Sequence, residues 1–527
     1  MPTRGLKVSV ICLSIAGTLL AGEVPKITGA DSASLLLDSY RAGKDLAPSE
    51  RAILLTFLCK TASEHNLSYT AEWAQEALRI ASQLPPDWNR LAIQKNALAA
   101  LSYANPERAM ALLRSMDLPI EGGNGVFPED LRSDAALTIF KNYWLEKKPL
   151  GLDEVRSIAA YLGQTGQYPY MAVGFILNDV ISHQKTAHSE LPGGASSILL
   201  DAYASYQRGS KFRSEDEEFV DFLESLQMLL PPALLKSGVE IAVERLTLQK
   251  DPAEYQYISR VQTQKGTATF HSRADELLFE LLPLVRQVDA ALADKLLESN
   301  QALKQAGAAG GTVVASEGAM IIGSSASPEK EELALQGSRA QEVREIASDH
   351  PEQALALSQT ITDPALRSTA MAGVADSKPA QAGEIRSAIA KIVPTMHEGQ
   401  ERLVVLSALV EASWAAGDAA GFRDALSNAF SLGQKLFEED MDAHPGQATY
   451  GVEAFETLAD LVKTGARVDP ATTTAMVHQI DDVQLKAFLL AQLADVLYSS
   501  APELAKPSGT DGKQTAENAD DLPVRTP

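Results

Sequence analysis

The feature that most constrains the fold is a helical spacing of apolar residues that runs from near Asp31 almost to Ser500. Apolar side chains recur every three or four residues, and Pro, Gly and Asp-Pro pairs interrupt the pattern. Ala and Leu dominate and aromatic residues make up only 6%, which favours helices because sheets prefer β-branched and aromatic residues. No convincing run of alternating strands is present. The sequence therefore predicts an all-α protein.

The segment from Ser214 carries these signals most clearly. Ser214 and Glu217 have the spacing of a capping box, and the acidic residues between them favour the positive end of a helix. The helix that follows is predicted to turn one apolar stripe inward, made of Phe219, Phe222, Leu223, Leu226 and Leu230.

Faint internal repeats predict how the helices are arranged. The run Asn-Pro-Glu-Arg-Ala-Met-Ala-Leu at 105–112 closely matches His-Pro-Glu-Gln-Ala-Leu-Ala-Leu at 350–357. Proline is tolerated in the first turn of a helix, and the alanines let neighbouring helices approach closely. Because a two-helix unit cannot bury its apolar face alone, such units are expected to stack. A second pair aligns without gaps, matching Ile361, Asp363, Leu366, Arg367, Ala372, Ala375 and Asp376 with Ile480, Asp482, Leu485, Lys486, Ala491, Ala494 and Asp495.

These strings resemble a known class of repeat. Pro351-Glu352-x-Ala354-Leu355, followed by Ile361-x-Asp363-Pro364-x-x-Arg367-x-x-Ala370-Met371, is similar to the degenerate helix-pair repeats of bacterial α-solenoids of the tetratricopeptide and HEAT kind. The Trp-Leu-Gly-Tyr pattern of a standard tetratricopeptide unit is missing. The resemblance implies stacked helical hairpins, an α-solenoid or α-α superhelix, that serve as a binding scaffold.

Two changes in composition suggest where the chain divides. Residues 304–328 are rich in Gly, Ala and Ser, and the helical period fades there, so we expect a linker between helical repeat regions at 31–303 and 329–501. The two apolar runs inside this segment allow a short hairpin, or docking onto a neighbour, as alternatives. From Pro502 the chain is polar, which predicts a disordered tail over 502–527.

The N-terminus has the pattern of an export signal. Arg4 and Lys7 give a positive start, and an uninterrupted apolar and small stretch extends to Leu20. That stretch is shorter than the ~20 residues that cross a bilayer as a helix. Residues 1–22 are therefore predicted as a signal peptide, with an uncleaved N-terminal anchor as the alternative and no other stable membrane span. Without them the chain retains one cysteine, Cys59, which lies in an apolar helical run and is predicted to be a core residue. Secreted eukaryotic domains usually carry more cysteines, so a bacterial periplasmic or extracellular location is expected.

The charge balance limits the kinds of partner. The formal net charge is −23, from 46 basic and 69 acidic side chains. A surface this negative repels phosphate backbones and anionic headgroups, which argues against nucleic-acid and peripheral membrane binding. The charge serves solubility in the first instance, and a basic partner is the alternative that it favours.

Catalytic and metal-binding motifs are missing from the sequence. It contains neither a phosphate-binding loop nor a Gly-x-Ser-x-Gly elbow, so we predict no cofactor and assign no catalytic residue. His183 and His188 are five residues apart, which on a helix separates them by about 140°. A calcium loop beginning at Asp440 would have Pro445 where glycine is required. We therefore predict no metal site.

One loop suggests binding. Gln167-Tyr168-Pro169-Tyr170 opens a helix with two tyrosines, a residue type enriched in interaction hot spots, so Tyr168 and Tyr170 are the candidate partner-contacting residues. Packing of both rings against neighbouring helices is the alternative. The function predicted from the sequence is an exported helical-repeat scaffold that binds a protein or peptide. An α-helical carbohydrate-active enzyme and a structural envelope protein are the alternatives. An enzyme of that class usually needs aromatic rings that stack on sugars, and all four tryptophans, Trp73, Trp88, Trp144 and Trp414, are predicted to lie in the core.

Overall fold

The computed structural model describes residues 29–118, 130–147, 151–182, 191, 194–209, 212, 214–249, 255–263, 266–309, 313–322, 328–444 and 449–500. The predicted signal peptide and the predicted tail lie outside these ranges. Within them the chain forms 23 α-helices, three short 3₁₀ helices and three β-strands. The all-α prediction is confirmed, with the addition of one small sheet that we did not expect from the sequence.

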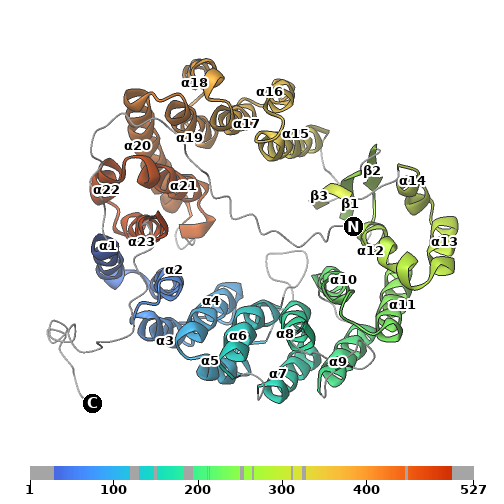
Figure 1. Ribbon diagram of the computed structural model, residues 1–527. Coiled ribbons are helices and arrows are strands. Elements are labelled where there is room, and N and C mark those ends of the chain that lie inside the picture. Colours follow the sequence, from blue (N-terminus) through green and yellow to red (C-terminus); the bar gives the residue numbers. More distant parts are fainter. Residues whose placement is uncertain are drawn as a thin grey trace, which may run out of the picture.

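The helices form a ring with an inner and an outer layer (Figure 1). We call the inner layer the inner wall; its helices are α2 (Pro48–Glu64), α4 (Trp88–Ala104), α6 (Leu131–Lys147), α8 (Tyr170–Ser182), α10 (Ser214–Leu226), α12 (Arg273–Val288), α15 (Pro328–Ile346), α17 (Pro364–Ser377), α19 (Gln400–Ala415), α21 (Glu453–Val468) and α23 (Val483–Ser500). The outer layer contains α1 (Gly29–Ala42), α3 (Thr70–Ala81), α5 (Pro106–Leu113), α7 (Leu152–Thr165), α9 (Ala195–Arg208), α11 (Pro232–Leu248), α13 (Ala290–Ser299), α14 (Gln301–Ala309), α16 (Pro351–Ser358), α18 (Pro379–Ile392), α20 (Ala419–Ala443) and α22 (Pro470–His478).

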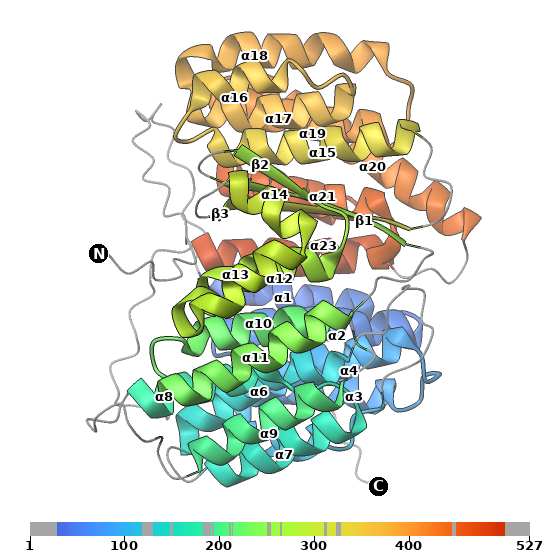
Figure 2. The same cartoon turned by 90° about the vertical axis from the view of Figure 1, so that its right-hand side faces the viewer.

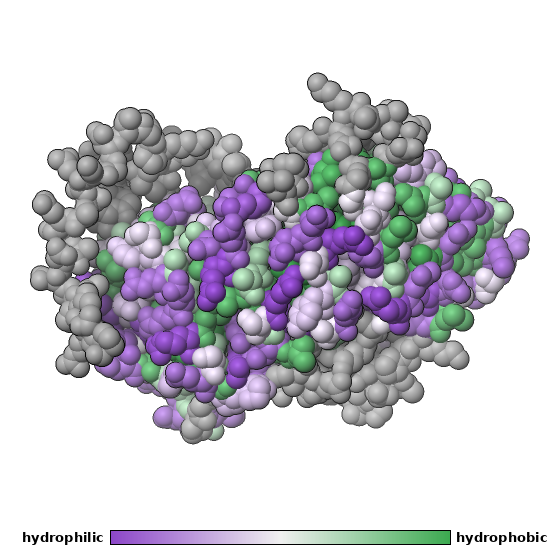
Figure 3. Space-filling view, turned by 90° about the horizontal axis from the view of Figure 1, so that it is seen from below, coloured by the Kyte–Doolittle hydropathy of each residue, from purple (hydrophilic) through white to green (hydrophobic). Residues whose placement is uncertain are grey.

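Neighbouring helices of the inner wall contact one another around the ring. From α2 through α4, α6, α8 and α10 to α12, each helix packs against the next, and α15, α17, α19, α21 and α23 do the same. The outer helices fill the spaces between successive inner ones, as α3 does between α2 and α4. Seen from the side of α5 and α7, the outer surface mixes hydrophilic and hydrophobic residues (Figure 3). That these helix pairs are the repeating unit of a solenoid stays a prediction.

The two ends of the helical region meet, because the last helix, α23, packs against the first two helices. Its sequence, Val-Gln-Leu-Lys-Ala-Phe-Leu-Leu-Ala-Gln-Leu-Ala-Asp-Val-Leu-Tyr-Ser-Ser, carries apolar residues on every side, as expected of a helix buried all round. It packs against α21 and α22 on one side and against α1 and α2 on the other. Ser39 Oγ of α1 donates to the carbonyl oxygen of Ala487 at 2.7 Å. Beside this seam, Thr449 Oγ1 donates to the buried Glu50 carboxylate at 2.6 Å.

A three-stranded antiparallel sheet lies between α12–α14 and α15 (Figures 1 and 2). Its strands are β1 (Tyr255–Thr263), β2 (Gly266–Phe270) and β3 (Val313–Ile322), and β1 is central. Ser259 pairs with Phe270 across β1 and β2, and both side chains are buried. The buried Glu276 of α12 accepts hydrogen bonds from Ser259 Oγ at 2.7 Å and from the Tyr257 hydroxyl. This carboxylate ties the sheet to the inner wall.

The predicted linker contains regular structure. Its first residues belong to α14, and its two apolar runs form one strand, β3, which pairs with β1 rather than folding into a hairpin of its own. The hydrophobic core does not divide there either. One buried cluster extends from α1 to α14 and continues through α19–α23, while a second one occupies α15–α19. The core is shared across the two expected regions because the ring closes through α23.

The matched sequence repeats adopt the same local structure. Pro106 and Pro351 each lie in the first turn of a helix, as predicted. In the ungapped pair, Asp363 and Asp482 each accept the backbone N–H three residues later, at 2.8 and 2.7 Å. An aspartate at this position caps the free N–H groups of a helix N-terminus. The isoleucine two residues before each cap, Ile361 or Ile480, is buried.

Candidate functional site

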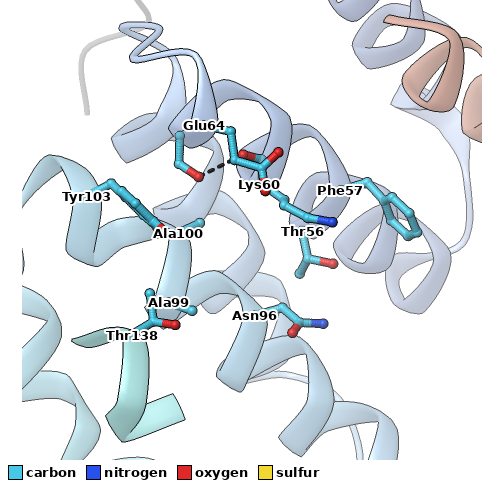
Figure 4. Close-up of a pocket in the computed structure, with 10 residues that line it drawn as sticks. Thr56, Phe57, Lys60, Glu64, Asn96, Ala99, Ala100, Tyr103 and Thr138 are labelled. Atoms are coloured by element: carbon cyan, nitrogen blue, oxygen red, sulfur yellow. Dashed lines mark hydrogen bonds between the residues drawn. The ribbon is translucent and has the colours of Figure 1, made fainter. Parts of the chain in front are cut away.

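A hollow of about 390 Å³ opens on the inner wall between α2, α4 and α6 (Figure 4). Figure 4 shows Phe57 and Tyr103 at its opposite ends. Lys60 and Glu64 stand on its rim, and neither forms an ion pair with another described residue, so both charges are available to a ligand. The hollow is lined by Thr56, Phe57, Lys60, Ser63, Glu64, Asn96, Ala99, Ala100, Tyr103 and Thr138.

Helical spacing explains why these side chains gather. Phe57, Lys60 and Glu64 follow one another at three- and four-residue intervals, so they share one face of α2. Asn96 and Tyr103 lie on the corresponding face of α4. The opposite faces of both helices are apolar and buried in the core, which fixes the orientation of each helix. The hollow therefore results from the same amphipathic pattern that builds the ring.

Exposed apolar side chains continue along the inner wall beyond the hollow. Leu137 of α6, next to the lining residue Thr138, is exposed, and Met171 of α8 is exposed as well. Lys141 Nζ lies 5.6 Å from the ring centroid of Phe175, so the exposed faces of α6 and α8 meet. A cation over an aromatic face adds a modest attraction. This part of the wall offers apolar and aromatic contacts with cations between them.

The next part of the wall, on α10 and α12, is acidic. Desolvation by the surrounding protein, reinforced by Asp134, raises the pKa of Glu218 to about 8. Desolvation and the neighbouring Glu276 raise the pKa of Glu280 to about 7. The pKa of Asp221 is also raised, by desolvation first. Carboxyl groups that are only partly ionised near neutral pH gain charge when a cation approaches.

A buried network positions Glu218. Gln167 Nε2 donates to its carboxylate at 2.6 Å, and Ser214 Oγ donates to Gln167 Oε1 at 2.9 Å. The backbone N–H of Gln167 donates to Asp130 Oδ2 at 2.9 Å, and that carboxylate forms a fully buried ion pair with Arg132 at 2.8 Å. Ser214 is the first residue of α10, so it lies inside the helix and not at the capping position predicted for it, and its hydroxyl donates to Gln167.

The predicted partner-contacting residues are not on the surface. Tyr168 is 1% exposed and Tyr170 0% exposed. The Tyr168 hydroxyl donates to the carbonyl oxygen of Ile198 at 3.3 Å, and that of Tyr170 donates to Glu215 at 3.3 Å. Their loop is held inside because Gly166 lies against the Asp130 and Arg132 side chains, where a Cβ atom would not fit. We therefore withdraw both tyrosines as binding residues, since a partner cannot reach them.

The tryptophans divide into two groups. Trp73 and Trp144 are buried, as predicted, whereas Trp88 and Trp414 are 42% and 45% exposed. For those two the core prediction was wrong, because Trp88 begins α4 and Trp414 lies in the last turns of α19, where neighbours cover less of a ring.

The remaining predicted residues have simpler outcomes. Cys59 is buried, as predicted, and burial raises the pKa of its thiol. His183 and His188 lie outside the described residues. At the end of α20, His444 Nδ1 lies 3.1 Å from Asp440 Oδ1, and the loop that follows is outside the described ranges. Within those ranges, no three His, Cys, Asp or Glu side chains are grouped as metal ligands would be.

The hollow was missed in the sequence for a physical reason. Phe57 and Tyr103 sit in apolar helical runs and are indistinguishable there from core residues. A charged residue within such a run was the available signal, since Lys60 interrupts an otherwise apolar stretch of α2. Which helices face the centre depends on ring closure, which spacing alone does not reveal.

Comparison with known proteins identifies no relative of this chain. No protein-family model, curated protein or solved structure matches the chain. None of the described helices combines the length and apolar character that a membrane crossing requires. The fold and the site define an all-α protein whose paired helices close into a ring around an exposed inner wall.

Proposed function

We propose that this chain is an exported helical-repeat scaffold that binds a segment of a protein or peptide along its inner wall. The observation that carries the proposal is the hollow between α2, α4 and α6, together with the exposed apolar side chains that continue from it onto α8. Exposed apolar surface that is continuous, with polar groups beside it, is typical of interaction sites.

The chemistry of the wall suggests the kind of segment. Phe57 and Tyr103 offer aromatic contacts, and Asn96 offers an amide to a partner backbone. Farther along, Glu218 and Glu280 favour basic side chains. An extended segment with an apolar residue followed by Lys or Arg matches this order, and it agrees with the negative charge of the chain.

The raised pKa values of Glu218 and Glu280 provide a way to measure the binding of a basic segment. A basic segment that approaches Glu218 or Glu280 lowers the pKa of that group, so the carboxyl group releases a proton on binding. Binding should therefore tighten as the pH rises from 6 to 9. Calorimetry near pH 7 in buffers of different ionisation enthalpy should detect the released protons.

The partner can be captured directly. We would tag the chain, crosslink it in the envelope of its native host and compare the wild type with Tyr103→Ala on the inner wall and Leu200→Ala on the outer helix α9. Both replaced side chains are 53% exposed, so neither change is expected to unfold the chain. One dominant protein, lost with Tyr103→Ala and kept with Leu200→Ala, is the expected result. Recovery of the chain alone would contradict partner binding.

One observation supports the alternative function, that of a carbohydrate-active enzyme. A carboxyl group whose pKa is raised by desolvation is suited to act as the general acid in glycoside hydrolysis, and Glu218 and Glu280 are the candidates for that role. The exposed tryptophans belong to other helices, Trp88 to α4 and Trp414 to α19. Release of reducing ends from envelope glycans, abolished by Glu218→Gln or Glu280→Gln, would favour this function over the scaffold.

A further inference from the structure

A second hollow, of about 650 Å³, lies in the outer layer of the ring. It opens between α3 and α5, and the outward side of α4 forms its floor. Three arginines line it, Arg79 from α3, Arg90 from α4 and Arg108 from α5. A group of arginines is unexpected in a chain whose formal net charge is −23.

The carboxylates of this hollow are already paired. Glu76 accepts from Arg51 Nε at 3.2 Å and from the Tyr40 hydroxyl at 3.1 Å. Asp117 accepts from Arg90 Nη2 at 3.1 Å, so these two charges cancel each other.

Two arginines are left uncompensated. Arg79 and Arg108 are exposed, and neither forms an ion pair with another described residue. The hollow therefore carries two positive charges that no carboxylate of its lining balances.

A buried amide adds a hydrogen-bond donor. Gln94 is only 9% exposed and lines the same hollow. Its Oε1 accepts the backbone N–H of Asp117 at 3.4 Å, which turns Nε2 the other way. Nε2 donates to no other described residue, and it is not among the buried unpaired atoms of the described residues, so it stays accessible to a ligand. A ligand oxygen in the hollow would satisfy it.

We propose that this hollow binds a small organic phosphate monoester. Two uncompensated guanidinium groups match a dianion, and every free polar group named here is a donor, as a phosphate requires. The hollow is much larger than a phosphate group alone, and Leu78, Leu112 and Met116 line it as well, so the ester group has apolar contacts. The site is separate from the inner wall, and its test does not depend on the proposed function.

Calorimetric titration of the full-length chain with phenyl phosphate tests the proposal. Benzyl alcohol serves as the neutral comparison and succinate as a dianion without phosphorus. We expect one phenyl phosphate per chain at physiological salt and no binding of benzyl alcohol. Arg79→Gln and Arg108→Gln should each weaken binding about tenfold or more, because a hydrogen bond to a charged group is lost.

Matched variants complete the test. Arg286→Gln removes an exposed arginine of α12 that has no described ion pair, so it should leave the affinity unchanged. Gln94→Met keeps the side-chain length and should weaken binding severalfold; circular dichroism shows whether it remains folded. The proposal is overturned if phenyl phosphate does not bind, if Arg286→Gln weakens binding as much as Arg79→Gln, or if succinate binds as tightly as the phosphate.

Discussion

Replacing Phe488 with alanine should loosen the seam that closes the ring. The ring of Phe488 is buried, and it stands edge-on to Phe57 of α2 and to Phe455 of α21, with 5.8 Å between centroids in both cases. Deleting a buried phenylalanine side chain costs about 3–5 kcal/mol because a cavity is left. Each edge-on ring pair contributes about 0.5–1.5 kcal/mol beyond area burial. The substitution therefore weakens the packing of α2 as well as that of α21, although Phe57 and Phe488 are far apart in sequence.

Amide hydrogen exchange read by mass spectrometry locates this loss. In Phe488→Ala we expect faster exchange in α1 and α2 as well as in α23, since all three pack at the seam. Phe140→Ala is the matched control, because Phe140 is equally buried but belongs to α6. It should speed exchange in α4–α8 and leave α23 unchanged. If Phe488→Ala leaves the exchange of α2 unaltered, the ring does not close as described.

Three further predictions concern buried groups. Arg132→Met strands the Asp130 carboxylate in the core, so the free energy of unfolding should fall by about 3–5 kcal/mol in urea titrations; a loss below about 1 kcal/mol would refute the importance of this pair. The folded state keeps a proton on Glu218 between its ordinary pKa of 4.5 and the raised value of about 8, so ionisation costs stability as the pH rises through this window. Glu218→Gln should therefore reduce the drop in Tm between pH 5 and pH 9, and an unchanged drop would contradict the assignment. Cys59 should resist iodoacetamide in the native chain and react once urea unfolds it, as followed on its own peptide; rapid native labelling would show that the thiol is accessible.

The helices could be predicted because their apolar spacing is local information. The stripe from Phe219 to Leu230 is buried as expected. The sheet was missed, although Tyr257 and Ser259 are two residues apart and both buried, because β1 is a single short run between long helical patterns. Ring closure was missed because it joins helices from opposite ends of the sequence. The one available signal was that apolar residues occur on every side of α23, which is expected of a helix with neighbours on both sides.

The candidate site could not be predicted residue by residue. Tyr168 and Tyr170 looked like binding residues because Tyr is common at interfaces, but the loop that carries them is held inside by Asp130 and Arg132. A pattern of apolar residues does not distinguish a core face from a face turned toward the centre of a ring. Tyr103 could be assigned to the inner wall only once α4 had neighbours on both sides.

Site-specific photocrosslinking tests the central claim that the inner wall is the binding surface. A benzophenone side chain would replace Tyr103 on the inner wall in one variant and Leu200 on the outer helix α9 in another, two positions that are equally exposed. After irradiation in cells of the native host, mass spectrometry would identify any adduct. We predict an adduct with one partner protein from position 103 and none from position 200. Adducts from position 200 alone, or from neither position, would contradict the claim.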